Sequence, residues 1–217
     1  IQVDLHLDTP TQMLVKGLTL DAAHGLEAGL PQLRAGGSNV VVEVLWPPRK
    51  TDHKKRTFDL LAAVEKSIQK NDDLVLVRTP TEARATVANG QVAVLVSIEG
   101  AHGLGTGADW PEVFQQLVRR GLRLMGITWS FSNRFAGSSG DGGGGLSDEG
   151  RALVKLARKH RVILDVSHAS RQTTMEICES SPLPVIASHS NAKAVRNVAR
   201  NLTDDEIRCI AKTGGVI

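Results

Sequence analysis

The stretch VAVLVSIEG, residues 92–100, places a glutamate directly behind an almost continuous apolar run. Runs of this kind, rich in β-branched residues, are typical of strands that are buried on both faces of a parallel sheet. The run predicts a strand at Val92–Ile98. Similar runs predict further strands at Ile1–His6, Asn39–Leu45, Leu122–Thr128, Val162–Val166 and Pro184–Ser188, with a shorter, accessory one at Leu74–Val77.

Helical patterns lie between these strand candidates. Residues 60–68 carry an apolar stripe with helical spacing. Thr79 and Thr203 are each followed three residues later by a glutamate, which predicts helix starts with capping boxes. Asp109 and Ser147 are candidate N-caps of two more helices. The alternation of strand and helix predicts a parallel sheet with right-handed crossovers.

Two architectures fit this alternation, an open doubly wound sheet and a closed (β/α)8 barrel. Polar residues recur where several of the predicted strands end: His6, Asp8, Glu99, Trp129, His168 and His189. In a barrel these ends converge on one mouth, where the active sites of that fold lie, whereas in an open sheet they would spread along an edge. We therefore predict a (β/α)8 TIM-type barrel that occupies residues 1–217 as a single domain.

The length of the chain affects this prediction. It has 217 residues, whereas a (β/α)8 barrel usually needs about 250. A seventh strand is only starting at Ile217. We therefore expect a barrel that is truncated after six strands and the start of a seventh, and incomplete at its C-terminus.

The composition limits the classes of partner. A net charge of +3 and a hydrophobic fraction of 41% indicate a folded globular chain. No apolar run approaches the roughly 20 residues that a membrane span needs, so we expect no transmembrane segment in this chain. Aromatic residues make up 3%, which leaves no stacking platform for single-stranded nucleic acid. The one basic run, residues 49–56, is interpreted as a solvated segment, so we expect no nucleic-acid partner.

The two cysteines carry little information about function. Cys178 and Cys209 lie far apart in the sequence and form no CxxC motif, which excludes a structural zinc knuckle. We interpret them as ordinary helix residues rather than a disulfide, so the cytoplasm is the default compartment. Because the chain begins with Ile rather than Met, a leader or an anchor could have been removed, and the compartment stays open.

The polar strand ends carry the chemistry. His6 and Asp8 are two residues apart on a strand and therefore face the same side. Glu99 follows a buried strand and needs a partner, because a buried charge is paired or bound to a metal. His168 and His189 each follow an apolar strand and a serine. Three imidazoles and two carboxylates suit a divalent metal such as zinc, and five ligands exceed the four of one tetrahedral ion, so we predict two zinc ions bridged by a carboxylate.

Asp165 lies close to this set, three residues before His168. It either orients a neighbouring ligand from a second layer of contacts or is simply a polar residue at a strand end. The sequence leaves these two interpretations open.

The motifs taken together resemble those of the renal (membrane) dipeptidase family of zinc metallopeptidases, in the amidohydrolase-like barrel superfamily. The matching stretches are HLD at 6–8, LRAGG at 33–37, IEGAH at 98–102, GLRLMGIT at 121–128, DVSHAS at 165–170, SHSNA at 188–192, RN at 200–201 and TGGV at 213–216. The resemblance implies that His6 and Asp8 bind one zinc ion. It implies that His168 and His189 bind the other, and that Glu99 bridges both.

The resemblance also bears on the substrate. It implies that Arg200 binds the terminal carboxylate of a dipeptide, a role that suits the planar guanidinium fork. Where the family commonly has a histidine that contacts the scissile carbonyl, this chain has Trp129. Trp129 could line the substrate pocket or donate its single hydrogen bond. The catalytic aspartate of the family lies beyond Ile217, so no catalytic residue is assigned within the chain.

The predicted function is zinc-dependent hydrolysis of dipeptides by a metal-bridging hydroxide. Two alternatives stay open. One is another amidohydrolase-like activity on the same dimetal site, such as that of a deacylase or a lactam hydrolase. The other is a non-catalytic fragment or pseudoenzyme. Whether the protein forms a homo-oligomer also stays open, as do the native metal and the preferred side chains of the substrate.

Overall fold

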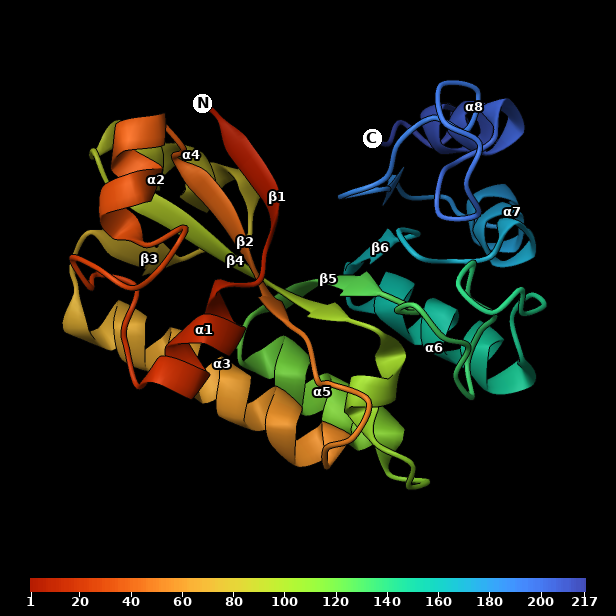
Figure 1. The fold of residues 1–217 in the computed structure, drawn as a ribbon, viewed down its shortest axis with the longest axis horizontal. Helices are drawn as coiled ribbons and strands as arrows, with labels where there is room; N and C mark the ends of the chain where they lie inside the picture. The colour runs from red at the N-terminus through yellow and green to blue at the C-terminus, as the bar shows by residue number, and fades with distance from the viewer.

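The computed structural model describes residues 1–217, and Figure 1 shows a curved parallel sheet with helices packed along its outer side. The strands are β1 (Val3–Leu7), β2 (Val40–Leu45), β3 (Leu74–Leu76), β4 (Val92–Glu99), β5 (Leu122–Gly126), β6 (Ile163–Asp165) and β7 (Val185–Ile186). The helices are α1 (Thr9–Lys16), α2 (Leu30–Gly36), α3 (His53–Lys70), α4 (Pro80–Ala88), α5 (Trp110–Arg119), α6 (Asp148–Lys159), α7 (Arg171–Glu179) and α8 (Asp204–Lys212), with a short 3-10 helix, η1 (Ala101–Leu104).

The sheet runs in the order β1-β2-β4-β5-β6-β7, and all of its strand pairs are parallel. Strand β3 lies off this path and pairs with the first half of β4, where Leu74 lies opposite Val92. Strand β5 pairs with the second half of β4, where Gly126 lies opposite Glu99. The accessory role predicted for 74–77 is confirmed, and the architecture is a partial (β/α) barrel, as predicted.

The end of the chain lies beside the residue that follows β7. The backbone amide of Ala187 donates a hydrogen bond of 3.0 Å to the carbonyl of Val216. The residues at which a further strand was expected to start therefore lie beside β7.

Strand residues alternate between two apolar clusters. Val41 and Leu45 of β2 belong to a cluster of 41 buried residues that also contains the apolar faces of the helices. Val42 and Val44 belong to a separate small cluster with Leu124 and Ile186. Because successive strand residues point to opposite faces, this alternation assigns each residue to the helix-covered face or to the inner face of the sheet.

The same alternation orients the polar residues of β4. Val96 and Ile98 pack in the large cluster on the helix side. Glu99, one position further, therefore faces the inner side of the sheet. Glu43 of β2 is two residues from Val41, so its side chain points to the same face as that of Val41, toward the helices. The two buried glutamates thus lie on opposite faces.

The helix ends follow the sequence pattern with one exception. Thr79 and Thr203 form capping boxes with Glu82 and Glu206, and the Ser147 hydroxyl accepts a hydrogen bond from an amide of the first turn. Asp109 precedes α5, but the predicted cap is wrong, because its side chain makes no cap hydrogen bond.

The backbone explains this exception. An N-cap residue normally has an extended backbone that lets its side chain reach the first turn. Asp109 has ψ of 5° instead. Its carboxylate accepts a hydrogen bond from Nζ of Lys54 at 2.5 Å.

The two strands that precede His168 and His189 are shorter than predicted. Strand β6 stops at Asp165 and β7 stops at Ile186. The Asp165 side chain accepts hydrogen bonds from the backbone amides of Ser167 and Ser188, at 2.9 and 3.1 Å. The backbone bond from Val166 to the Ile186 carbonyl is the last of the ladder, and beyond it these side-chain hydrogen bonds hold the two strand ends together.

None of the helices combines the length and the apolar character that crossing a lipid bilayer requires.

Candidate metal centre

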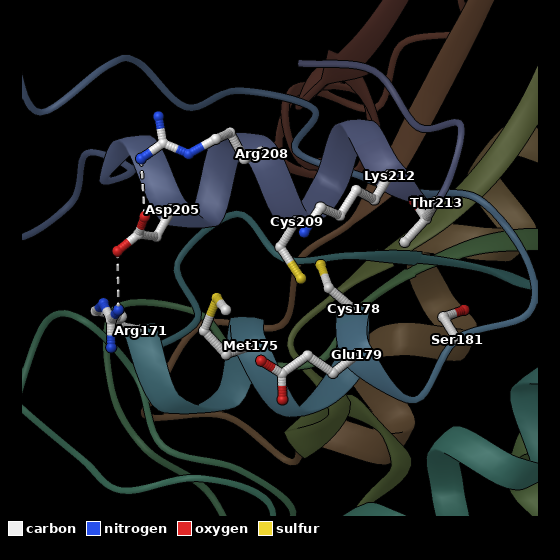
Figure 2. Close-up of a pocket in the computed structure, with 10 residues that line it drawn as sticks. All are labelled: Arg171, Met175, Cys178, Glu179, Ser181, Asp205, Arg208, Cys209, Lys212 and Thr213. Carbon is white, nitrogen blue, oxygen red and sulfur yellow. Dashed lines mark hydrogen bonds and ion pairs between the residues drawn. The ribbon is translucent and has the colours of Figure 1, made fainter.

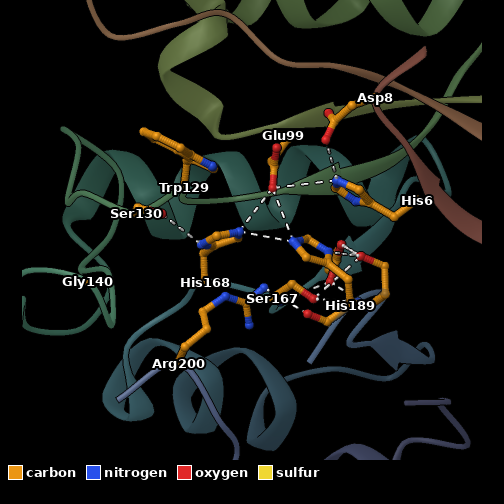
Figure 3. A network of polar contacts seen from close by, with 12 residues as sticks. His6, Asp8, Glu99, Trp129, Ser130, Gly140, Ser167, His168, His189 and Arg200 are labelled. Atoms are coloured by element: carbon orange, nitrogen blue, oxygen red, sulfur yellow. Dashed lines mark hydrogen bonds and ion pairs between the residues drawn. The ribbon is translucent and has the colours of Figure 1, made fainter. Parts of the chain in front are cut away.

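Four of the predicted ligands meet where β1, β4, β6 and β7 end (Figure 3). The Oε1 atom of Glu99 lies 3.1 Å from Nε2 of His168 and 3.3 Å from Nε2 of His189. Nε2 of His6 lies 3.7 Å from the same oxygen. Three imidazole nitrogens therefore surround one carboxylate oxygen, although the four residues are spread over more than 180 positions of the chain.

Asp8 lies at the edge of this group. Its Oδ2 atom is 3.9 Å from Nε2 of His6, and its side chain is 56% exposed, whereas that of Glu99 is 8% exposed. Partial burial and the nearby charge of Glu99 raise the pKa of Asp8. The structure thus brings together all five predicted residues, with Asp8 as the most accessible of them.

The protonation states suit metal ligands. Burial by itself would raise the pKa of Glu99, but hydrogen bonding with His168 and His189 outweighs it and lowers the pKa to about 2. Burial lowers the pKa of His6 and that of His168. These shifts favour an ionised carboxylate at Glu99 and uncharged imidazoles at His6 and His168, which are the forms in which these side chains bind metals.

The packing of the imidazoles also fits a cation. Nε2 of His168 and Nε2 of His189 are 3.0 Å apart, a distance at which one nitrogen must carry a proton and the other must accept its hydrogen bond. The ligand atoms of His6, Glu99 and His189 all lie within 4.8 Å of one another. A metal ion would take the place of the proton and use the converging lone pairs, so the residues present fit a zinc site.

Serine hydroxyls contact the Nδ1 atoms of two of the histidine rings, on the side away from Glu99. Oγ of Ser130 lies 3.3 Å from Nδ1 of His168, and Oγ of Ser188 lies 2.8 Å from Nδ1 of His189. The Ser188 hydroxyl donates its only proton to Asp165. In the neutral ring the Ser188 oxygen therefore accepts a hydrogen bond from Nδ1–H of His189, and Nε2 of that ring is available as a ligand.

This arrangement assigns Asp165 a position behind the ligands. It holds Ser188 through its hydroxyl and its backbone amide, and Ser188 in turn holds His189. Of the two interpretations that the sequence left open, the contacts agree with the orienting one. The sequence pattern of a serine before each histidine marked Ser188, but it assigned no task to that serine and did not include Ser130.

Removing the Ser188 hydroxyl is expected to weaken metal binding. In Ser188→Ala the Nδ1 proton of His189 loses its acceptor, so the ring loses its fixed orientation. We expect metal affinity to fall about 10- to 100-fold, the usual effect of removing a contact behind a ligand. Competition with a chromogenic chelator measures it. Ser38→Ala, between α2 and β2, is the matched control, and equal affinities in the two variants would contradict the role of Ser188.

The backbone of His168 is strained. Its φ of +69° lies in the left-handed region, which costs a residue other than glycine roughly 1–3 kcal/mol. Its carbonyl oxygen accepts hydrogen bonds from the amide and the hydroxyl of Ser139 and from the hydroxyl of Ser138. Such strain persists where surrounding contacts enforce it, and it is concentrated at functional sites.

Arg200 lies beside the two histidines (Figure 3). Its guanidinium donates to the hydroxyl of Ser190 at 2.5 Å and to the carbonyl of His189 at 3.0 Å. Burial lowers the pKa of Arg200. Both acceptors are neutral, so the charge of Arg200 has no directly bonded carboxylate and is available to an anionic group.

Trp129 forms part of an aromatic wall next to the same site. Its ring centroid lies 5.0 Å from that of Trp46, 5.6 Å from that of Phe131 and 6.2 Å from that of His168. The position agrees with pocket lining, one of the two roles considered for this indole.

The chain is similar in sequence to known peptidases. The sequence model for "Membrane dipeptidase (Peptidase family M19)" matches residues 1–217. The chain is 34% identical over 149 residues to the protein named Dipeptidase verJ of Clonostachys rogersoniana, an alignment that covers 67% of this chain and 38% of that protein. The matched part thus spans about two fifths of that curated relative.

Two solved structures share the fold. The dipeptidase AC, described as a metallopeptidase of family M19, superposes with a TM-score of 0.90 at 24% identity, covering 99% of this chain and 71% of that one. A metallopeptidase from Rhodobacter sphaeroides, liganded with a phosphinate mimic of the dipeptide L-Ala-D-Ala, superposes with a TM-score of 0.87 at 24% identity, covering 99% and 72%. At this level of identity the two structures show that the fold is shared.

Proposed function

The chain belongs to the membrane dipeptidase family, peptidase family M19, and on this premise we propose that it catalyses the zinc-dependent hydrolysis of dipeptides. One observation carries the proposal: three imidazole nitrogens lie within 3.7 Å of a single buried oxygen of Glu99. The resemblance found in the sequence and the family match lead to the same activity.

We assign five residues as ligands of two zinc ions. His6 and Asp8 would hold one ion, His168 and His189 would hold the other, and Glu99 would contact both. Zinc ions bound in this way polarise a carbonyl and lower the pKa of water enough to supply a nucleophile at neutral pH. The ligands lie at or near strand ends. Ser130 fixes the orientation of the His168 ring, and Ser188 with Asp165 fixes that of the His189 ring.

The same proposal assigns the substrate contacts. Arg200, whose present acceptors are neutral, binds the terminal carboxylate of the dipeptide with its two terminal nitrogens. Trp129 and the neighbouring aromatic rings pack against the substrate and keep water away from one side of it. The curated relative that is named a dipeptidase supports a dipeptide as the substrate.

Metal removal and return test the proposal. Treating the intact protein with a chelator is expected to abolish hydrolysis of an unmodified dipeptide, and adding zinc to the dialysed protein is expected to restore it. The release of free amino acid is measured at each stage. Turnover that persists after the metal content has fallen to background would contradict zinc-dependent hydrolysis.

A substrate panel separates the proposed activity from its alternatives. The zinc-loaded intact protein is given dipeptides, N-acyl amino acids and lactams at equal concentrations. We expect the dipeptides to have the highest kcat/KM. Faster turnover of an N-acyl amino acid or a lactam would make the protein a deacylase or a lactam hydrolase, and zinc binding without any turnover would make it a pseudoenzyme.

A further inference from the structure

The two cysteines, far apart in the sequence, meet in the structure. Cys178 lies near the end of α7 and Cys209 lies in α8, and these two helices pack against each other. Figure 2 shows the two sulfur atoms facing one another between the helices. Both cysteines are free thiols, and they are 4% and 8% exposed. Sequence separation alone had suggested two unrelated helix residues, and the packing of α7 on α8 makes them neighbours.

The thiols influence each other. Burial, together with the nearby Cys209 thiol, raises the pKa of Cys178 to about 12. The Cys178 thiol is therefore protonated near neutral pH, and neither cysteine contributes a contact to the metal centre. The pair is a buried nucleophilic group that the proposed peptidase activity does not use.

A small reagent can reach the pair through an adjoining cavity. The cavity has a volume of about 380 Å³ and is lined by both cysteines and by Met175. Three cations, Arg171, Arg208 and Lys212, also line it and are themselves exposed. Arg171 and Arg208 share the carboxylate of Asp205, and Glu179 also lines the cavity, so three cations face two carboxylates and the excess is one positive charge. Anionic reagents are therefore favoured over neutral or cationic ones.

We propose that Cys178 and Cys209 are a site of oxidative modification, at which an anionic disulfide such as oxidised glutathione converts the two thiols into an intramolecular disulfide between α7 and α8. The inference stands on the facing thiols and the cationic cavity, and it is independent of the proposed peptidase activity.

The reaction is a pair of thiol–disulfide exchanges. The Cys209 thiolate, which is the more exposed of the two, attacks one sulfur of the oxidised glutathione. A protein–glutathione disulfide forms, and one glutathione leaves as a thiolate. The Cys178 thiolate then attacks the Cys209 sulfur, the Cys178–Cys209 bond forms, and the second glutathione leaves. The two protons of the cysteines end on the two released glutathiones, so the protein loses two electrons and the reagent gains them.

The bond would affect the part of the chain between the cysteines. The segment from Cys178 to Cys209 contains β7, His189 and Arg200. Closing a loop of this size removes conformational freedom from the unfolded chain, so the oxidised protein is expected to be more stable. For a chain of this length the expected rise in Tm is about 10 °C.

Mass spectrometry on the intact protein tests the proposal directly. The protein is incubated with oxidised glutathione at pH 8.5, free thiols are blocked with N-ethylmaleimide, and the digest is analysed without reduction. We expect the peptide of Cys178 to be joined to the peptide of Cys209, two hydrogens lighter than the separate peptides. Recovery of both cysteines as maleimide adducts, or of each cysteine with its own glutathione, would overturn the proposal.

Thermal unfolding provides the second measurement. We expect the Tm of the oxidised wild-type protein to rise and to return to its original value after reduction with dithiothreitol. Cys178→Ala and Cys209→Ala, treated in the same way, are expected to show no rise. A comparable rise in either single variant would assign the stabilisation to another event and would overturn the proposal. The wild-type peptide analysis remains decisive if either variant fails to fold.

Discussion

Glu99→Gln is expected to lose both metal ions and to lower kcat/KM for a dipeptide by roughly three orders of magnitude. The three imidazole nitrogens converge on Oε1 of this carboxylate. Glutamine has no negative charge. Its side-chain amide also contains an NH2 group, which donates hydrogen bonds and cannot replace the carboxylate oxygen toward those nitrogens. Metal ions supply several kcal/mol of transition-state stabilisation, and each tenfold in rate corresponds to about 1.36 kcal/mol.

The buried glutamate on β2 provides a matched control for this experiment. Glu43 is fully buried, neither of its oxygens has a hydrogen-bond partner, and it faces the helices rather than the metal centre. Burial, together with the nearby charges of Asp4 and Asp8, raises the pKa of Glu43 well above its usual range and so favours its uncharged form, and Glu43→Gln keeps the shape of that side chain. We expect Glu43→Gln to keep both its metal content and its activity.

Metal content by plasma mass spectrometry and dipeptide turnover are measured on both variants. If Glu99→Gln kept two ions per chain with turnover similar to that of Glu43→Gln, the assignment of Glu99 as the bridging ligand would be wrong. If both variants lost metal, the effect would reflect general destabilisation of the sheet, which unfolding curves of the two proteins would reveal.

Arg200→Met is expected to lower kcat/KM for a dipeptide by about two to three orders of magnitude while the metal content stays the same. Its guanidinium has only neutral acceptors in the structure, Ser190 and the His189 carbonyl. Removing one partner of a largely buried ion pair costs about 3–5 kcal/mol, and about 1.4 kcal/mol corresponds to a tenfold change. The loss should appear mainly when the substrate has a free terminal carboxylate.

A dipeptide amide isolates this contact. It has the same scissile bond, but its terminal carboxylate is replaced by a neutral amide. The wild-type protein is expected to prefer the free dipeptide strongly, and Arg200→Met is expected to treat the two substrates alike. Arg196→Met is the control, because Arg196 is exposed and lies four residues away. An equal preference for the free dipeptide in wild type and Arg200→Met would contradict the assigned role, and loss of metal would show that Arg200 acts by holding His189.

Local patterns were sufficient for most of the fold. The strand candidates and the capping boxes at Thr79 and Thr203 are present in the structure. These features depend on residues close together in the chain, because burial on both faces needs a continuous apolar run and a capping box needs residues three apart. Asp109 shows the limit of that reasoning, since its carboxylate bonds to Lys54, which a local pattern does not reveal.

Some features of the candidate site could likewise be predicted from local sequence, and others could not. The types of candidate ligand and their grouping near strand ends could be predicted, because parallel strands direct their C-terminal ends toward one side of the sheet. The partner of each imidazole could not. His189 is held by the adjacent Ser188, whereas His168 is held by Ser130, which is 38 residues away. Both histidines have a serine before them, so the sequence contains nothing that separates these two cases.

The amino-acid order alone therefore settles the alternation of strands and helices, the side of the sheet on which each polar residue emerges, and the chemical character of the donor set. The tertiary structure alone settles that Ser130 reaches His168, that the backbone of His168 is left-handed, and that the thiols of Cys178 and Cys209 face each other. The physical reason is the range of the forces involved. Propensity and periodicity act over a few residues, whereas strand register and helix packing bring together atoms whose separation along the chain carries no information about their distance in space.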